Sequence, residues 1–539
     1  MLRAALIAST LALTGCVYIS VDKSDAEDAP PAVSASPSAL PSPVPAHQRQ
    51  SPWYTDARAR VASSPAGHGA KNVVLFIGDG MGISTITAAR ILAGQQAGNS
   101  GEENRLSFET FPQTGLVKTY NVDSQTADSA GTMSAIMMGV KTDISVFGID
   151  EQVEADNCAS GRGHELLSLL DIAELAGAAT GVVSTARLTH ATPGATYART
   201  ANRDWEDDSE LTDEARAEGC TDIASQFLAH RGRLNEEFGA GMSDGIEVAL
   251  GGGKRHFLPE SVEGGKRKDG RNLIAQWQAA NPTGTFVSDA QGLASTDHTP
   301  VLGLFSDSHM GYASQRSAAD ATQPGLPAMT RKALELLRDR DEGFLLVVEA
   351  GRIDHAHHAG NAANALNDTI ELAAAVQVVM DETDPEDTLV LVTADHSHVF
   401  TMAGYPRRGN PILGKVVPAW SDEPTLDSDG LPYTTLGYMN GRGYRDLGDE
   451  TNADVTYGEA PTAGRQDLRD VDTTAIGYHQ ESLVPLSAET HGGEDVAVYA
   501  RGPGARAVVG VNEQNLLFHV MLSATDWEQR AARRGDKRS

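Results

Sequence analysis

The chain of 539 residues has little of several features that would point to other kinds of protein. It has three cysteines, so a small fold held by many disulfides is excluded, and its length provides a large buried core without them. Aromatic residues make up 5% of it. Lys and Arg number 43 against 73 Asp and Glu, a formal charge of -30. Binding to a nucleic-acid backbone usually requires the opposite excess, so nucleic acid is not expected as the main partner.

Three familiar active-site signatures are also missing. The sequence GDGMG at 78–82 follows a predicted strand, but Ile83 stands where a dinucleotide fingerprint requires its third glycine. In addition, the carboxylate of Asp79 would repel a pyrophosphate. The GGGK sequence at 251–254 lacks the spacing of a P-loop, and no GxSxG motif marks a serine-hydrolase elbow. These absences argue against nucleotide-binding and α/β-hydrolase interpretations.

The N-terminus carries a short apolar run, Ala4–Leu13, which follows Arg3 and leads into Cys16. The run is too short for an ordinary membrane span and has the plan of a secretory signal. The small residues before Cys16 resemble a bacterial lipobox, with an ordinary signal peptide as the alternative. We therefore expect residues 1–15 to be a lipoprotein signal peptide and Cys16 to carry the lipid. Val17 after the cysteine favours the outer membrane of a Gram-negative cell, facing the periplasm or the cell surface.

Cys158 and Cys220 remain as an even pair. In an exported chain oxidation is permitted, so we predict a disulfide between them, with two buried free thiols as the alternative.

Composition divides the rest of the chain into segments. Residues 16–52 are rich in Ala, Pro and Ser, and we predict a tether because they cannot bury enough apolar surface to fold alone. Residues 53–403 and 486–527 alternate short apolar runs with helical patterns, which predicts one large α/β domain with a mostly parallel sheet. Residues 404–485 lack periodicity and are predicted to be an insertion, and 528–539 a basic polar tail. The clearest predicted strands are Asn72–Ile77, Gly181–Ser184, Gly343–Val348, Thr388–Thr393 and Asp495–Tyr499.

Acidic and imidazole side chains lie beside four of these strands, where α/β sheets build ligand sites. They are Asp79, the group Glu349, Asp354, His355, His357 and His358, the pair Asp395 and His396, and the pair Glu489 and His491. On a helix Asp354 and His358 share one face, a spacing suited to one cation, whereas His357 points elsewhere. The mixture of oxygen and nitrogen ligands suits zinc, and an all-oxygen subset suits magnesium.

Ser129 lies in the sequence TADSAGT at 126–132, which leads into a helical run. At a helix N-terminus the backbone N–H groups and the macrodipole would stabilise both an alkoxide and a bound phosphoryl group. Taken alone, such a serine is better explained as a helix cap.

Taken together, GDGMG at 78–82, DSA at 128–130 and TADHSH at 393–398 resemble the alkaline phosphatase family. The resemblance spans residues 72–521. Residues 190–205 and 489–496, together with the two cysteines 158 and 220, are similar to the animal branch rather than the enteric bacterial one. The resemblance implies a three-layer domain with a crown-like insertion at 404–485. It also implies hydrolysis of phosphate monoesters through a phosphoserine intermediate on Ser129.

The resemblance further implies two zinc ions and one magnesium ion per subunit. The ligands that it assigns to one zinc are Asp354, His358 and His491. Those of the other zinc are Asp79, Asp395 and His396. Asp79 also bridges to the magnesium ion, whose remaining ligands are Thr192 and Glu349, with His190 and His355 near it and the substrate. Arg203 matches the arginine that clamps the phosphate.

Two further positions concern the subunit and a third kind of metal. Tyr405 matches a tyrosine that in animal enzymes reaches into the active site of the neighbouring subunit, which implies a homodimer. Ser306 stands after Phe305 where animal members carry a glutamate, so a calcium site is doubtful.

Two alternatives remain. One is another member of the same metal-dependent superfamily, such as a phosphodiesterase, a phosphoglycerate mutase or a sulfatase, although SAGTM at 129–133 lacks the sulfatase pattern C/S-x-P-x-R. The other is a noncatalytic metal-binding lipoprotein, which would not require both Ser129 and Arg203.

Overall fold

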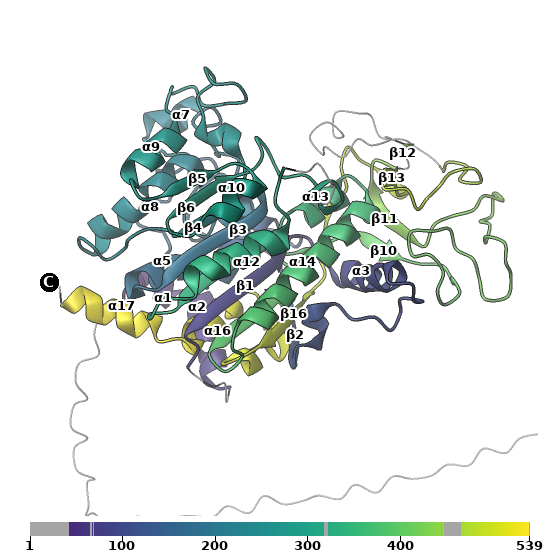
Figure 1. Ribbon diagram of the computed structural model, residues 1–539, viewed down its shortest axis with the longest axis horizontal. Helices are drawn as coiled ribbons and strands as arrows, with labels where there is room; N and C mark the ends of the chain where they lie inside the picture. The colour runs from purple at the N-terminus through teal and green to yellow at the C-terminus, as the bar shows by residue number, and fades with distance from the viewer. Residues whose placement is uncertain are drawn as a thin grey trace, which may run out of the picture. The chain divides into compact units, whose positions relative to one another are not determined.

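A ten-stranded sheet forms the centre of the computed structural model (Figure 1). The structure describes residues 42–64, 67, 69–316, 322–443, 445–446 and 465–537; the predicted signal peptide, Cys16 and most of the predicted tether lie outside them. Across the sheet the strands run β17 (Gly510–Glu513), β2 (Gln113–Lys118), β16 (Val496–Arg501), β8 (Thr388–Thr393), β1 (Asn72–Gly78), β7 (Phe344–Ala350), β3 (Ala179–Arg187), β4 (Val248–Gly252), β6 (Val301–Leu304) and β5 (Thr285–Val287). Only β16 is antiparallel to its neighbours in this sheet. The predicted mostly parallel α/β sheet is confirmed.

The three central strands β1, β7 and β8 are buried along their whole length. Their runs of Val, Leu and Ile fit a parallel strand that is covered on both faces. Ile77 of β1 pairs with Glu349 of β7 on one side and with Thr393 of β8 on the other. This register brings the residues that follow the three strands to the same edge of the sheet.

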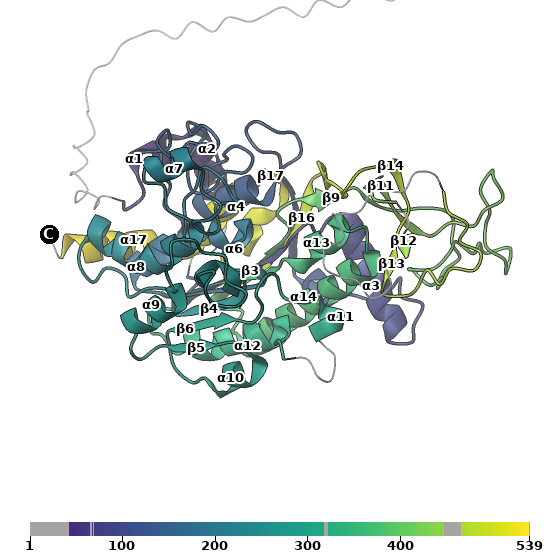
Figure 2. The ribbon, with the colours of Figure 1, turned by 90° about the horizontal axis from the view of Figure 1, so that it is seen from above.

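Helices cover both faces of the sheet (Figures 1 and 2). One face carries α12 (Leu326–Leu337) and α14 (Ala362–Glu382), against which pack α3 (Ile83–Gln96), α10 (Ala290–Ser295), α11 (Ala313–Arg316) and α13 (Arg352–His358). The other carries α2 (Pro52–Ala62), α4 (Ser129–Met138), α5 (Leu169–Ala176), α6 (Ala191–Gly194), α16 (Leu516–Ala524) and α17 (Trp527–Asp536). The predicted three-layer arrangement is confirmed.

The remaining elements are short or lie at the periphery. The helices are α1 (Ala46–Gln50), α7 (Asp213–Ala217), α8 (Ile223–Phe238) and α9 (Leu273–Ala280), with 3-10 turns at η1 (Ser107–Thr110), η2 (Lys254–Phe257) and η3 (Ala505–Val508). The small sheets pair β10 (Phe400–Met402), β11 (Leu436–Gly441) and β14 (Ser482–Pro485), then β12 (Arg445–Asp446) with β13 (Tyr478–His479), and β9 (Ser397–His398) with β15 (His491–Gly492). Strands β11 to β14 belong to the predicted insertion.

The last part of the predicted tether and the polar tail are helical where the structure describes them. Residues 46–50, assigned to the tether, form α1, and the buried Gln48 side chain bonds to the carbonyl oxygens of Met138 and Leu167 at 2.8 and 3.0 Å. The tail forms most of α17, in which Trp527 and Ala531 are buried. Tertiary packing orders both segments although their composition is polar.

The predicted bridge between Cys158 and Cys220 is present, with the two Cα atoms 5.9 Å apart. Within the described residues, no helix combines the length and the apolar character that a membrane span needs.

Candidate metal centre

Asp79, Asp395 and His396 meet at the edge of the sheet where β1 and β8 end. All three side chains are fully buried. His396 Nε2 lies 3.5 Å from an oxygen of Asp79 and 3.4 Å from one of Asp395. The backbone N–H groups of Gly80 and His396 donate to Asp395 Oδ1 at 3.0 and 2.9 Å. The left-handed backbone of Gly80, with φ of 68°, allows the chain to turn here beside the ring of His398.

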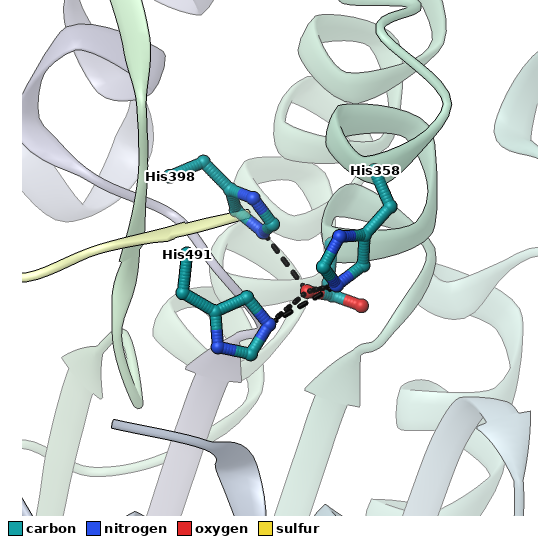
Figure 3. Close-up of side chains that lie close together, drawn as sticks. His358, His398 and His491 are labelled. Carbon is teal, nitrogen blue, oxygen red and sulfur yellow. Dashed lines mark hydrogen bonds and ion pairs between the residues drawn. The ribbon is translucent and has the colours of Figure 1, made fainter. Parts of the chain in front are cut away.

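A second group surrounds Asp354, which α13 presents toward three imidazoles (Figure 3). Asp354 Oδ1 lies 2.9, 3.2 and 3.4 Å from the Nε2 atoms of His398, His358 and His491, respectively. Asp354 and His358 come from one helical face, as predicted. His398 and His491 come from β9 and β15, where they pair directly with each other.

The ring orientations in this group are set by carbonyl oxygens. His358 Nδ1 lies 2.6 Å from the carbonyl oxygen of Glu489, and His491 Nδ1 lies 2.7 Å from that of Ala127. With the proton on Nδ1, each ring directs the lone pair of Nε2 toward the common centre at Asp354. This arrangement is typical of metal-ligating histidines.

Glu349 of β7 lies beside Asp79 and His190 in a third group. The Ser184 hydroxyl donates to one carboxylate oxygen of Glu349, and Thr192, the second residue of the short helix α6, is fully buried. His190 and His355 lie next to each other, with ring centroids 5.4 Å apart. The structure therefore brings together the residues to which the resemblance gave a magnesium site.

Ser129 is the first residue of α4, so its predicted position at a helix N-terminus is confirmed. Its hydroxyl oxygen lies 3.1 Å from His396 Nε2. The preceding Asp128 caps the helix through the N–H of Gly131 and accepts a hydrogen bond of 3.0 Å from Arg203 Nη1. Asp128 therefore holds the Arg203 guanidinium near Ser129, which follows Asp128 in the chain.

Among the described residues, no Lys or Arg forms an ion pair with Asp79, Asp395 or Glu349. Burial, together with Asp395, Asp354 and Glu349, raises the pKa of Asp79 well above its usual value, and burial raises that of Glu349 to about 7. Neither carboxylate oxygen of Asp79 accepts a hydrogen bond from a described residue. Because unpaired buried carboxylates are costly and are accommodated by metal ions, this donor set fits divalent cations.

Two residues of the centre were not assigned a role from the sequence, although one lies in a quoted motif. His398 joins the Asp354 group, and its Nδ1 lies 2.5 Å from Glu489 Oε2. His309, in the loop after β6, lies against His355 with ring centroids 3.9 Å apart. Its place shortly after the apolar run Val301–Leu304 was the available signal.

Three other predicted positions belong to none of the candidate metal groups found in the described residues. His357 points away from these groups, as expected, and contacts the hydroxyls of Tyr438 and Thr85 at 2.8 and 3.0 Å. Tyr405 is 83% exposed. Ser306 donates to the carbonyl oxygen of His309 at 2.7 Å.

The family model for alkaline phosphatase matches residues 70–527. The tissue-nonspecific alkaline phosphatase of Gallus gallus is 42% identical over 471 residues, which are 84% of each chain. Thermus thermophilus alkaline phosphatase has a TM-score of 0.61 at 24% identity, and covers 92% of this chain and 99% of its own. A mutant alkaline phosphatase of the Antarctic bacterium TAB5 has a TM-score of 0.57 at 23% identity, covering 86% and 99%.

The two kinds of match carry different information. The bacterial structures confirm the fold, and the higher identity to the chicken protein agrees with the animal-like sequence at 190–205.

Proposed function

The chain belongs to the alkaline phosphatase family and hydrolyses phosphate monoesters, and we propose that it does so through a phosphoserine on Ser129 in a centre holding two zinc ions and one magnesium ion. The observation that supports this most directly is the position of the Ser129 hydroxyl. It lies at the N-terminus of α4 and 3.1 Å from His396, beside Asp79, whose pKa is raised by burial and by three neighbouring acids.

The proposed reaction has two displacement steps. When bound, the metal ions supply the positive charge that favours a serine alkoxide and neutralises the departing alcohol oxygen. Ser129 Oγ attacks phosphorus, the bond from phosphorus to the ester oxygen breaks, and the alcohol leaves with a proton. A water molecule then attacks the phosphoserine, which releases inorganic phosphate and returns the proton to Ser129. The N–H groups at the start of α4 and the Arg203 guanidinium stabilise the nonbridging oxygens in both steps.

The ligand assignment is part of the proposal. We assign one zinc to Asp354, His358 and His491, the other to Asp79, Asp395 and His396, and magnesium to Asp79, Thr192 and Glu349. The clustering of these residues supports the assignment, as does the magnesium reported in the M3 site of the TAB5 mutant. Metal analysis of the purified protein checks it, and fewer than three bound divalent ions per chain in the active enzyme would contradict it.

Trapping of the intermediate tests the nucleophile. Acid quenching during turnover of a labelled phosphate monoester should leave label on the peptide that contains Ser129. Ser129→Ala should remove the label, whereas Ser134→Ala, on the same helix, should retain it. A metal-loaded wild type that carries no label at steady state and turns over no monoester would support the noncatalytic alternative.

A comparison of substrates separates the monoesterase from its superfamily relatives. We expect p-nitrophenyl phosphate to be hydrolysed much faster than its bis-ester, because the Asp128 and Arg203 pair is arranged to hold a terminal phosphoryl group. Preference for the diester would contradict the assignment.

We also propose a homodimer and an N-terminal lipid anchor. The insertion at 404–485 exposes Tyr405 at 83% and Trp420 at 78%, and such apolar exposure favours contact with a second subunit. Light scattering should give twice the chain mass, and Tyr405→Ser with Trp420→Ser should shift it toward the monomer. Cys16→Ser in the full chain should move the protein from the detergent phase to the aqueous phase.

A further inference from the structure

A cavity of about 250 Å³ lies beside the disulfide, apart from the proposed metal ligands. The residues of its wall that matter here are Cys158, Arg162, Arg199, Trp205, Gln226 and Arg233. Three arginines around one cavity are unusual in a chain of net charge -30. Glu165 is the one acidic residue among the described residues of the wall.

Two of the arginines have donors that no protein acceptor uses. Within the described part of the chain, Arg199 Nη2 and Arg233 Nη1 are buried and make no hydrogen bond. Carboxylates lie near both donors but beyond hydrogen-bond distance: Asp171 is 3.6 Å from Arg199 Nη2, and Glu237, which is 41% exposed, is 3.8 Å from Arg233 Nη1. Because buried donors are normally satisfied, these two groups indicate an acceptor that the protein itself does not provide.

The arginines are held in place by the surrounding chain. Arg199 Nε donates to the carbonyl oxygen of Leu166 at 2.9 Å, and Gln226 bonds both the N–H and the carbonyl oxygen of Arg199 at 2.9 and 2.8 Å. Arg233 Nη2 donates to the buried Asp171 at 2.8 Å. Asp171 lies 3.6 Å from Arg199 as well, so one carboxylate is shared between two guanidinium groups.

The formal charges of the three arginines are matched by Asp171, Glu237 and Glu165, but the hydrogen bonds of Arg199 and Arg233 stay incomplete. Burial and the neighbouring Arg233 lower the pKa of Arg199, which shows that the two guanidinium groups repel each other. The Glu165 carboxylate is itself engaged, since it accepts the N–H of Gly163 at 2.7 Å. An anion with several oxygens could accept from both arginines, and guanidinium groups recognise tetrahedral oxyanions well.

We propose that this cavity is a second oxyanion site, which binds inorganic phosphate between Arg199 and Arg233. Phosphate is the product of the reaction at the metal centre. The wall of the site includes Thr200 and Trp205, and Arg203 lies between them in the chain. The site is therefore built partly from the segment that carries the proposed phosphate clamp.

Equilibrium dialysis of the metal-loaded wild type with labelled inorganic phosphate tests the site. We expect two classes of bound phosphate per chain. Arg199→Gln and Arg233→Gln should each weaken one class at least about 10-fold, since each removes charge-assisted hydrogen bonds, and leave the other class unchanged. Arg231→Gln, an exposed arginine of the same helix as Arg233, should retain both classes.

The variants are checked separately for intact folding and for an intact metal centre. In both glutamine variants the kcat/KM for p-nitrophenyl phosphate should stay within about 2-fold of the wild type. If Arg199→Gln is too unstable to study, Arg199→Lys is used instead, because it preserves the charge. It should retain the second class with reduced affinity. A single class in the wild type, or two unchanged classes in both glutamine variants, would overturn the proposal.

Discussion

Two groups of buried charged side chains in this protein differ in whether the protein itself pairs their charges. Arg267 is fully buried, and its guanidinium binds both oxygens of Asp222 at 2.9 and 3.1 Å and one oxygen of Asp269 at 2.5 Å. Although burial opposes it, these hydrogen bonds raise the pKa of Arg267. At the end of the central sheet, by contrast, Asp79, Asp395 and Glu349 crowd together, and burial raises the pKa of each.

The contrast separates structural charge from functional charge. The Arg267 group is satisfied by the protein alone, so it stabilises the fold without any added ion. The Asp79 group is destabilising until cations arrive, and a protein retains such a cost where it serves binding or catalysis. Substitutions in the two groups should therefore respond differently to metal.

The largest effect is expected for Asp79→Asn. The variant should lose activity by about 10³-fold or more, since several kcal/mol of charge stabilisation depend on the metal site. After treatment with EDTA, however, it should be more stable than the wild type, because one repelling carboxylate has been removed. Urea unfolding in EDTA, and separately in zinc and magnesium, measures the change in stability without and with metal. Asp56→Asn, at an exposed position, is the control, and equal destabilisation in both media would contradict the contrast.

Arg267→Met should have the next largest effect. Removing this partner leaves the Asp222 and Asp269 carboxylates uncompensated, and a broken buried ion pair typically costs about 3–5 kcal/mol. The loss should be the same with EDTA and with metal, as measured by urea unfolding. Arg271→Met provides a control in the same loop, since that side chain is 41% exposed. A loss that disappears when metal is added would place Arg267 with the functional charges.

The sequence was sufficient to predict the residues that follow strands. Asp79 and Asp395 come directly after apolar runs that could only be central strands, so the edge at which they meet followed from the parallel sheet. The pairing of His398 with His491 could not be predicted in this way. It depends on two strands of two residues each, which pair although more than ninety positions separate them in the chain.

The helices at the two ends of the described chain could not be predicted for a related physical reason. Composition describes what a segment can bury alone, whereas α1 and α17 are ordered by contacts made elsewhere. Arg534 of α17 donates to the carbonyl oxygens of Glu174 and Leu175, at 3.1 and 2.8 Å, at the end of α5. Such docking has no periodic signature in a short polar segment.

Lys141 offers an intermediate case, a buried cation with one acidic partner. Its amino group lies 3.1 Å from Glu513 and 2.9 Å from the carbonyl oxygen of Tyr120. Burial nevertheless lowers its pKa to about 8, so between pH 8 and about 10.4 the unfolded chain binds a proton that the folded chain does not. Stability from this residue should therefore rise with pH across that window and be lowest below it.

Lys141→Met should flatten this dependence. At about 1.4 kcal/mol per pKa unit, the pH-dependent part is about 1–3 kcal/mol, which urea unfolding at pH 7 and pH 10 resolves. Lys118→Met removes the more exposed lysine beside the same Glu513 and should leave the rise with pH in place. An identical pH profile in wild type and Lys141→Met would show that the buried amino group does not titrate in this range.

The smallest effect is expected for Glu489, which contacts His398 of the Asp354 group. This buried acid accepts from the Val399 N–H at 2.8 Å and contacts His398 Nδ1, whose ring faces Asp354. Glu489→Gln keeps the shape but removes the charge that orients His398. Loss of such a supporting group typically lowers metal affinity about 10–100-fold, so zinc should leave the variant at a correspondingly lower chelator concentration, while the metal-free stability changes little. The exposed Glu423→Gln variant serves as the control. If Glu489→Gln instead destabilises the metal-free protein as Arg267→Met does, Glu489 belongs to the structural charges, and His398 is held in place by the fold rather than for the metal.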